Sequence, residues 1–286
     1  MCVALLLLYT YFYLDQERWI FKPNTDPTDG NASNLPNHAF EGWLSPPDQV
    51  FLSTAEIPQP SEGTAVMIHF QKFNARKQPA QGSILYCHGN KGNLEKCRLQ
   101  IRSFLDEGYD VWMMDYRTYG KSTGPLSETA LVNDARMFYR YLQVQQGVDE
   151  QDLIIWGRSF GSGIAAAVAA NNSPRMVVLE TPYWSIPDAA RRINPLLLPF
   201  LFRYHLPTHE CLEFINCPVH LIHGDSDEKI SHESSIDLAE LCRELNVVVQ
   251  PHLIEGGKHD LRGMEEFKVI LKRILAARAL AAGATH

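Results

Sequence analysis

Five short segments that are almost continuously apolar constrain the fold more than any other feature of this sequence. A strand exposed on one face alternates polar and apolar residues, whereas a strand buried on both faces is apolar along its length. Longer segments with helical periodicity separate the five runs. This alternation predicts an α/β fold in which helices cover both faces of a mostly parallel sheet. The runs are ILYC at 84–87, VWMM at 111–114, LIIW at 153–156, MVVL at 176–179 and VHLI at 219–222.

From residue 48 onward the pattern predicts eight strands and five helices in one domain. The expected strands cover residues 48–54, 64–72, 83–87, 110–115, 152–157, 175–180, 218–223 and 248–254. The expected helices cover residues 92–106, 128–146, 160–171, 232–244 and 264–282.

One segment, about 183–213, breaks this alternation because it is long and rich in proline and bulky apolar residues. A connection of that length without a function is uncommon in a compact domain, whereas lids and binding loops are the usual exceptions. We therefore expect a short lid inserted into a domain that spans residues 26–286.

Residues 1–25 are expected to form a separate N-terminal segment, because residues 1–14 are uncharged and apolar or aromatic. A helix of that length reaches about 21 Å, short of the roughly 30 Å of a bilayer core. The segment also lacks the basic start and the small-residue cleavage site of a signal peptide. We expect it to bind a membrane surface, so that the protein is membrane-associated and otherwise cytoplasmic. A helix packed on its own domain is the alternative.

The composition of the 286 residues excludes several classes of protein. Thirty-three acidic residues against 26 basic ones leave a net charge of −7, without a long Lys/Arg run that would follow a phosphate backbone. Nucleic acid is therefore not expected as a partner. Cys211 and Cys217 are close in sequence, but no third and fourth ligands cluster with them. We expect no metal site and no cofactor.

A serine lies between an expected strand and an expected helix, in the motif Gly157-Arg-Ser159-Phe-Gly161. A serine on a sharp strand-to-helix turn is the nucleophile of many hydrolases, and the flanking glycines let the strand and the helix approach each other. The spacing alone also fits an ordinary turn. The strand-turn-helix context favours a nucleophile elbow with Ser159 as the catalytic residue.

A nucleophilic serine needs a base that takes its proton and an acid that orients this base. His259 is the predicted base, because it follows the last expected strand in a glycine-rich loop, where an imidazole lies over the strand ends. Asp225, Asp227 and Glu228, all in the loop after VHLI, compete for the orienting role. Their spacing alone does not decide among them.

The third requirement is an oxyanion hole, formed by the N–H of the residue after the nucleophile and a second N–H from the loop after an earlier strand. Phe160 supplies the first. For the second, the strand that ends at Cys87 leads into a glycine-rich turn at 88–93, for which an ordinary strand-to-helix turn is the alternative. His88 in this turn is expected to be a scaffold residue, because His259 fills the position of the base better.

Several motifs together resemble the α/β-hydrolase superfamily of serine hydrolases. They are LYCHGNKGN at 85–93, DYRTYGKS at 115–122, GRSFG at 157–161, HGDSD at 223–227 and GKH at 257–259. More narrowly, they are similar to the branch of α/β-hydrolase-domain proteins that includes membrane-anchored lipid hydrolases and protein depalmitoylases. The resemblance extends from about Gln16 to the end of the chain. It implies an α/β-hydrolase fold with a mostly parallel, eight-stranded sheet.

The resemblance also implies roles for single residues. The family motif HGxxDxxV, matched here by residues 223–230, implies that Asp227 is the orienting acid. The backbone N–H of Asn90 is implied as the second oxyanion donor. One departure is Thr118, which stands where the family usually has the glycine of DYRGYG. The departure concerns the shape of that loop, not the catalytic machinery.

These residues and the resemblance imply a serine hydrolase that cleaves carboxylic ester or thioester bonds through an acyl-enzyme. Apolar lid residues are expected to bind the acyl group of a small-molecule or lipid-like substrate, and a lid that only packs on the sheet is an equal alternative. An amidase or peptidase of the same fold, and a catalytically silent interaction protein, remain open. The lid residues expected to contact substrate are Leu197, Phe200 and Phe202.

Overall fold

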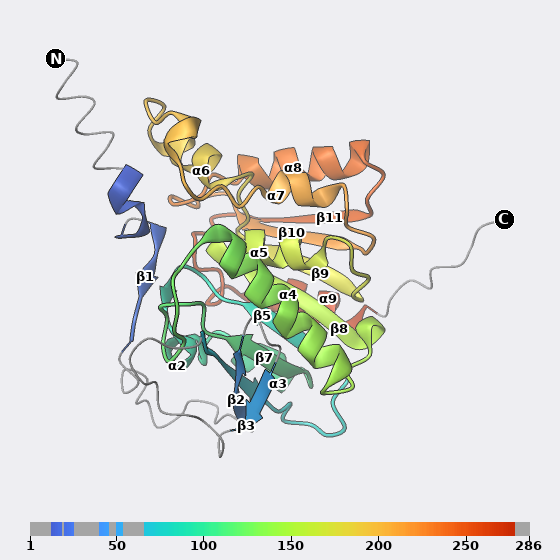
Figure 1. Ribbon diagram of the computed structural model, residues 1–286. Helices are drawn as coiled ribbons and strands as arrows, with labels where there is room; N and C mark the ends of the chain where they lie inside the picture. Colours follow the sequence, from blue (N-terminus) through green and yellow to red (C-terminus); the bar gives the residue numbers. More distant parts are fainter. Residues whose placement is uncertain (1–12, 19, 26–39, 46–49, 54–65, 278–286) are drawn as a thin grey trace.

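A nine-stranded sheet forms the centre of the computed structural model, which describes residues 13–18, 20–25, 40–45, 50–53 and 66–277 (Figure 1). From one edge to the other, the strands are β11 (Val249–Ile254), β10 (Val219–Gly224), β9 (Met176–Glu180), β8 (Leu153–Arg158), β5 (Ser83–Cys87), β7 (Asp110–Met114), β4 (Ile68–Phe73), β2 (Phe40–Ser45) and β3 (Val50–Ser53). The strands from β11 to β7 are parallel to one another. β4 is antiparallel to both of its neighbours, and β2 and β3 form an antiparallel edge.

Helices cover both faces of this sheet, as the apolar runs require. One face packs against α4 (Glu128–Val144), α5 (Phe160–Ala169) and α8 (Glu233–Glu244), and the other against α2 (Leu94–Cys97), α3 (Arg102–Asp106) and α9 (Glu265–Ala276). Successive residues of a strand point to opposite layers: Leu85 belongs to the first hydrophobic cluster, and Ile84 and Tyr86 belong to the second. Both faces of β5 are thus buried, which explains its continuous apolar sequence.

The sheet differs from the prediction by one strand, because β2 was not expected. Its sequence FEGWLS includes a glutamate and a glycine, which obscure the strand pattern. The helix predicted over residues 92–106 is instead α2 and α3 with a turn between them. The apolar positions of both helices are nevertheless buried. The helix predicted over 264–282 is α9, which ends at Ala276, and residues 278–282 lie outside the described part.

The segment from 183 to 213 contains α6 (Ile186–Ile193), the short 3₁₀ helix η3 (Pro199–Leu201) and α7 (Thr208–Leu212). α6 begins where Ser185 accepts a hydrogen bond from the backbone N–H of Asp188 at 3.2 Å, with Pro187 in the first turn. Both features are typical of helix starts. Figure 1 shows α6 at the edge of the molecule, on the same side as the N-terminal segment.

The described part of the N-terminal segment packs on the domain. Residues 13–18 are helical, and the buried side chain of Gln16 accepts a hydrogen bond from the backbone N–H of Arg203 at 2.8 Å. Residues 1–12 of the expected membrane segment lie outside the described residues. In the part that is described, no helix combines the length and the apolar character needed to cross a bilayer.

The residues that follow this helix join the core. The ring of Phe21 is 3% exposed and lies 5.2 Å from the ring of Phe160 and 4.7 Å from that of Tyr204, centroid to centroid. β1 (Lys22–Pro23) then pairs in parallel with β6 (Lys91–Gly92). Residues 20–23 therefore connect the start of the chain to the loop after β5.

Candidate active site

Ser159 lies at the turn between β8 and α5 and has an unusual backbone conformation, with φ 51° and ψ −122°. L-residues rarely adopt a positive φ, so this turn is strained. The backbone N–H of Ser159 donates to the carbonyl oxygen of Glu180 at 2.8 Å, which fixes the turn against β9. Ser159 thus stands at the carboxyl end of the parallel strands, where open α/β sheets bind their ligands.

Two glycines make this turn possible. A Cβ atom at Gly157 would lie 2.4 Å from the carbonyl oxygen of Gly161, and a Cβ atom at Gly161 would lie 2.1 Å from the carbonyl oxygen of Cys87. Both distances are far below van der Waals contact. Only glycine fits at either position, in agreement with the steric reason inferred from the sequence.

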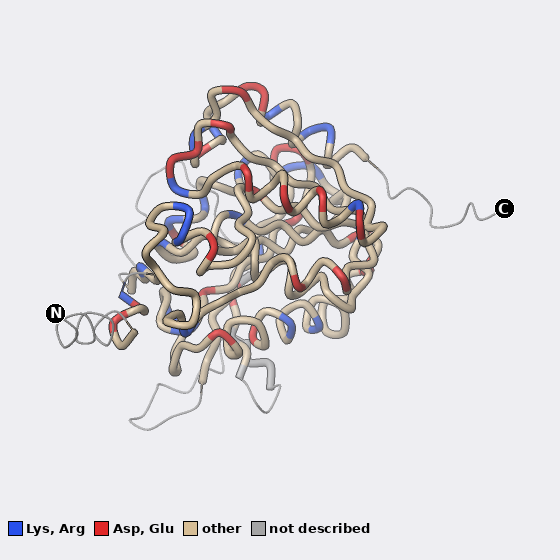
Figure 2. The backbone as a smooth tube through the Cα atoms, turned by 90° about the horizontal axis from the view of Figure 1, so that it is seen from above, with Lys and Arg blue, Asp and Glu red and all other residues tan. Residues whose placement is uncertain are grey.

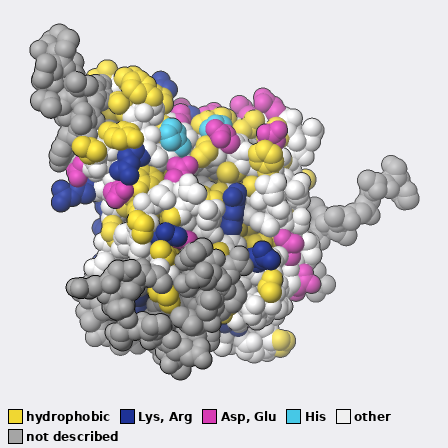
Figure 3. Space-filling model, in the orientation of Figure 1, with side chains coloured by type: hydrophobic (Ala, Val, Ile, Leu, Met, Phe, Trp, Pro, Cys, Tyr) yellow, Lys and Arg dark blue, Asp and Glu magenta, His cyan; other side chains and the backbone are white. Residues whose placement is uncertain are grey.

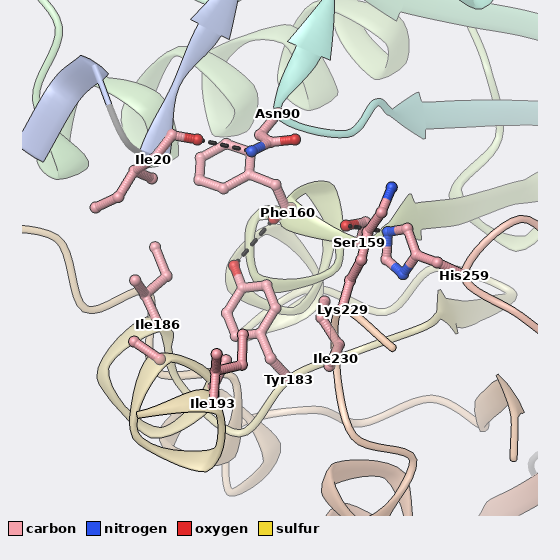
Figure 4. Close-up of a pocket in the computed structure, with 12 residues that line it drawn as sticks. Ile20, Asn90, Ser159, Phe160, Tyr183, Ile186, Ile193, Lys229, Ile230 and His259 are labelled. Carbon is pink, nitrogen blue, oxygen red and sulfur yellow. Dashed lines mark hydrogen bonds between the residues drawn. The ribbon is translucent and has the colours of Figure 1, made fainter. Parts of the chain in front are cut away.

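His259 connects Ser159 to Asp227 through two hydrogen bonds. Its Nε2 atom lies 3.0 Å from Ser159 Oγ, and its Nδ1 atom lies 2.7 Å from Asp227 Oδ2. Figure 4 shows the side chains of Ser159 and His259 next to each other. His259 comes from the loop between β11 and α9, and Asp227 comes from the loop between β10 and α8. In the imidazole tautomer that donates from Nδ1–H to the carboxylate, Nε2 is the atom that can accept a hydrogen bond from the Ser159 hydroxyl.

Further hydrogen bonds hold the Asp227 carboxylate. Its Oδ1 atom accepts from the backbone N–H groups of Lys229 at 2.8 Å and Ile230 at 3.1 Å, and its Oδ2 atom lies 3.2 Å from Nε2 of His223. Burial by itself raises the pKa of Asp227, but hydrogen bonds with His223 and His259 outweigh burial and hold the pKa well below its usual range. The carboxylate is therefore charged at neutral pH.

The two competing acids make other contacts. Asp225 Oδ1 accepts from the backbone N–H of Gly256 at 2.8 Å and from Ser226 Oγ at 2.9 Å, and it thereby joins the loops after β10 and β11. Glu228 is exposed. Of the three acids considered from the sequence, Asp227 is the one that the structure brings to His259.

The backbone N–H groups of Asn90 and Phe160 belong to residues that line the same pocket as Ser159. Neither donates a hydrogen bond within the described part of the chain, so both are available to a ligand. Asn90 is held firmly: its side-chain amide donates to the carbonyl oxygen of Ile20 at 2.7 Å, and its own carbonyl oxygen accepts from Tyr119 Oη at 2.8 Å. The loop that carries the Asn90 N–H is thus fixed from two sides.

Two other residues noted in the sequence have structural places. His88 is fully buried, burial lowers its pKa, and its ring stacks on Tyr116 with the centroids 4.1 Å apart. Thr118 has a φ of 69°, a conformation that glycine adopts most readily. This conformation explains the glycine that the resembling family usually has at that position.

An apolar pocket of about 270 Å³ opens beside Ser159 (Figure 4). Tyr183 stands at its centre and donates from Oη to the carbonyl oxygen of Phe160 at 3.0 Å. One wall is α6, which contributes Ile186, Ala189, Ala190 and Ile193. Ile20 and Ile230 complete the apolar lining.

The lid residues expected to contact substrate do not line this pocket. Phe202 is 5% exposed and packs in the interior, Phe200 is 74% exposed and points to solvent, and Leu197 is half-buried. α6 forms the wall in their place, and the sequence did not predict it. Its sequence IPDAARRI contains two arginines and an aspartate, so only the isoleucines and alanines indicate an apolar face.

Among the residues that the structure describes, no group of three or more His, Cys, Asp or Glu side chains could hold a metal ion. Cys211 and Cys217 are both free thiols. Neither therefore takes part in a disulfide.

Comparison with known proteins identifies the fold. Residues 82–206 match the family described as alpha/beta hydrolase fold. The chain has the α/β-hydrolase fold. It is 29% identical over 221 residues to an uncharacterized protein of Mycobacterium tuberculosis, covering 77% of this chain and 72% of that protein. It is 26% identical over 238 residues to the lysophosphatidylserine lipase ABHD12 of Danio rerio, covering 73% and 61% of the two chains.

Solved structures show the same architecture. An esterase of Pyrococcus furiosus superposes with a TM-score of 0.64 and 17% identity, over 89% of this chain and 96% of the esterase. A thermophilic esterase of Thermogutta terrifontis superposes with a TM-score of 0.56 and 15% identity, over 76% and 88%. At these identities the likeness concerns the fold. The predicted α/β-hydrolase fold with a mostly parallel sheet is confirmed.

Proposed function

We propose that this α/β-hydrolase-fold protein is a serine hydrolase that cleaves the carboxylic ester or thioester bond of an apolar acyl group. The observation that carries the proposal is the continuous chain of hydrogen bonds from Ser159 through His259 to Asp227. The similarity to a protein named as a lipase and to a structure named as an esterase supports the reaction class.

In the first half of the reaction, His259 Nε2 takes the proton of Ser159 Oγ as this oxygen attacks the substrate carbonyl carbon. The N–H groups of Asn90 and Phe160 stabilise the negative charge that develops on the carbonyl oxygen. Asp227 holds the imidazole in the tautomer with Nδ1 protonated and stabilises the imidazolium. The imidazolium then gives its proton to the departing alcohol or thiol, and the acyl group remains on Ser159.

In the second half, His259 takes a proton from a water molecule as the water oxygen attacks the acyl carbon. The proton returns to Ser159 Oγ when the bond between this oxygen and the acyl carbon breaks. The products are a carboxylic acid and the free serine, so one water molecule is consumed for each bond cleaved.

The apolar pocket beside Ser159 is the proposed acyl site. Its isoleucine and alanine wall on α6 favours an alkyl chain, because each buried methylene contributes about 0.8 kcal/mol. Tyr183 is buried and already hydrogen-bonded, so it presents its ring to the pocket. These features support an apolar acyl group over a charged one.

A fluorophosphonate probe followed by mass spectrometry tests the nucleophile. We expect the probe to label Ser159, and the variant Ser159→Ala to lose esterase turnover by on the order of a millionfold without loss of the folded state. The exposed Ser103 on α3 offers a matched control, Ser103→Ala, which should keep both labelling and turnover. A folded wild-type protein that neither reacts with the probe nor hydrolyses p-nitrophenyl esters would instead be a silent interaction protein.

The acyl site is tested with p-nitrophenyl esters of increasing chain length. Ala190→Phe fills part of the pocket, so the preferred chain should become shorter. Phe200→Ala removes an exposed ring outside the pocket and should leave the chain-length preference unchanged. If Phe200→Ala changed the chain-length preference and Ala190→Phe did not, the acyl site would instead be formed by the lid residues expected from the sequence.

We also propose that the protein binds a membrane surface through its N-terminal segment and the region around α6. Figure 3 shows hydrophobic side chains gathered on this side of the molecule. Exposed apolar patches of this kind mark contact surfaces. The large side chains concerned are Tyr13 (43% exposed), Leu14 (67%), Ile193 (70%), Leu196 (78%), Leu198 (41%) and Phe200 (74%).

A further inference from the structure

A second cavity, of about 580 Å³, also borders Ser159 and has the opposite chemical character. It shares Asn90, Ser159, Lys229 and His259 with the apolar pocket, so the two cavities meet at the reacting atoms. Its walls carry six cationic side chains and one carboxylate, that of Asp260. The cations are Lys22, Lys91, Lys96, Arg158, Lys229 and Arg262.

This concentration of positive charge contrasts with the rest of the chain. The protein carries a net charge of −7, and acidic residues are spread over the molecule (Figure 2). Arg262 pairs with Asp260, and Arg158 Nε pairs with Glu180 Oε1 at 3.0 Å. Among the described residues, no carboxylate lies within ion-pair distance of three of the lysines, Lys22, Lys91 and Lys229. The cavity lining therefore carries more cationic than anionic side chains.

Arg158 distinguishes this cavity from a group of exposed surface lysines, because its side chain is largely buried and held in place. Its side chain is 11% exposed, and Nη2 donates to the carbonyl oxygen of His259 at 3.1 Å. Gly89 lies next to both groups: a Cβ atom there would be in ordinary contact with Arg158 Nη1 and with Ser159 Cβ, at 3.9 Å from each. The guanidinium is thus held beside the nucleophile.

The chemistry of the proposed reaction decides which half of the substrate meets these cations. His259 must give its proton to the departing oxygen or sulfur, so the leaving group lies on the side of the imidazole. His259 borders both cavities, but Asp260 and Arg262, one and three residues after it in the chain, line the cationic cavity and not the apolar one. The apolar cavity under α6 then holds the acyl chain.

We propose that the cationic cavity binds the leaving group of the substrate, an alcohol or thiol that carries a phosphate. A phosphate brings a charge of about −1.5 to −2 and three acceptor oxygens, which suits several cations better than a single carboxylate does. The inference rests on the proposed hydrolase function and adds the substrate class. A glycerophosphate from a lysophospholipid and the phosphorylated thiol of an acyl-coenzyme A share this chemistry.

Two matched substrate pairs separate these sources. One pair is 1-decanoylglycerol 3-phosphate and 1-decanoylglycerol, and the other is S-decanoyl-4′-phosphopantetheine, the phosphorylated thiol part of coenzyme A, and S-decanoylpantetheine, all assayed below their micellar concentrations. Within each pair the acyl group is constant and only the phosphate differs. We expect the wild type to have the higher kcat/KM for the phosphate-bearing member of at least one pair, and that pair identifies the source.

The variant Lys22→Gln/Lys91→Gln/Lys229→Gln removes the three lysines that form no ion pair with the described residues. We expect the ratio of kcat/KM between the phosphate-bearing and the neutral member to fall by about tenfold or more. The control Lys77→Gln/Lys268→Gln/Lys272→Gln removes the same charge at positions that do not line the cavity and should keep the ratio. A similar fall of the kcat/KM ratio in the control variant would overturn the proposal, and so would an unchanged ratio in the cavity variant.

A measurement on the wild type alone covers the case in which the triple variant does not fold. Glycerol 3-phosphate should inhibit hydrolysis of the neutral member competitively, and glycerol should not. Equal inhibition by glycerol 3-phosphate and by glycerol, or no inhibition by either, would overturn the proposal. If hydrolysis of the neutral member depends on Ser159 but no phosphate preference exists, only this inference fails; if that hydrolysis does not depend on Ser159, the proposed function fails as well.

Discussion

The side-chain amide of Asn90 donates a hydrogen bond to the backbone carbonyl oxygen of Ile20, with the two atoms 2.7 Å apart. The backbone N–H of Lys22 donates back to the carbonyl oxygen of Asn90 at 2.9 Å. The start of the chain therefore positions the loop whose N–H faces the proposed oxyanion. The N-terminal segment, expected from the sequence to bind a membrane surface or to pack on its own domain, continues directly into residues that support the site.

The first prediction follows from this clamp. Asn90→Ala keeps the backbone N–H but removes its brace, so kcat should fall by about tenfold or more while KM changes little. Steady-state kinetics with a short soluble ester measure both constants. Asn172→Ala removes a similar bond, from a side-chain amide to the carbonyl oxygen of Val168, outside the site and should leave both constants unchanged. Equal effects of the two variants would argue against a role for the brace.

Two N-terminal deletions distinguish membrane anchoring from structural support of the proposed active site. Removal of residues 1–12 should abolish binding to lipid vesicles, measured by co-sedimentation, and leave hydrolysis of short soluble esters largely intact. Removal of residues 1–24 also deletes Phe21 and β1, so activity and the melting temperature should both fall. If the shorter deletion lowers the melting temperature as much as the longer one, residues 1–12 pack on the domain and the anchor proposal is wrong.

The two aspartates of one loop allow a direct comparison. Asp227→Asn should lower kcat by roughly a thousandfold or more, because the imidazole loses its orienting charge. Asp225→Asn keeps an oxygen for the backbone N–H of Gly256, and its rate should stay within a few fold of the wild type. Kinetics on p-nitrophenyl esters rank the two variants, and the opposite ranking would make Asp225 the orienting acid.

Thr118 holds a positive φ without being glycine, which costs stability. Thr118→Gly relieves this strain but raises the entropy of the unfolded chain, and we expect a net gain of about 0.5 to 1 kcal/mol in the free energy of unfolding. Denaturant titration measures the change. The exposed Thr129 lies within α4, so Thr129→Gly should shift stability in the opposite direction. A loss of stability in both variants would show that Thr118 is unstrained.

His69 is buried between two carboxylates, with Nδ1 2.7 Å from Asp115 Oδ2 and Nε2 beside Glu41. Burial by itself lowers the pKa of His69, but the hydrogen bonds to the two carboxylates outweigh burial and raise it. A raised pKa contributes stability fully below the unfolded value of about 6.5, and this contribution is lost as the pH rises through the folded pKa. The stability difference between wild type and His69→Gln should therefore be largest at pH 6 and shrink toward pH 9.

His220 offers the opposite trend as a control. Burial and the neighbouring His252 lower its pKa to about 4, so the wild type loses stability as the pH falls below about 6.5. The stability advantage of wild type over His220→Gln should thus decrease as the pH falls. The stability advantage of wild type over His69→Gln should increase as the pH falls. Parallel slopes for the two variants, from denaturant titrations at several pH values, would contradict both assignments.

Much of the proposed site could be predicted because its signals are local. Ser159 follows an apolar strand and stands between glycines for which the structure leaves no room for a side chain. Choosing Asp227 over Asp225 needed the family resemblance, since both acids lie in one loop and only the path of the backbone decides which carboxylate reaches His259.

The parts that the sequence did not predict depend on contacts between distant segments. β1 and β6 are each two residues long, and such short strands have no period of their own. α6 has two isoleucines at its ends and charged residues between them, so its role as a pocket wall follows only from where the chain places it. The apolar residues of 196–202 gave a stronger signal, but tertiary packing turns Phe202 inward and Phe200 outward.

The contacts that assemble this site also determine when during folding it can work. The hydrogen bond between Ser159 and His259 joins residues 100 positions apart, and the one between Asn90 and Ile20 joins residues 70 positions apart. Contacts so distant in sequence form late, because long loops must close first. A growing chain on the ribosome lacks the proposed base until residue 259 has emerged. If the proposed function is correct, the return of turnover in a refolding experiment reports the last of these loop closures. A protein that is only partly folded is therefore an inactive one.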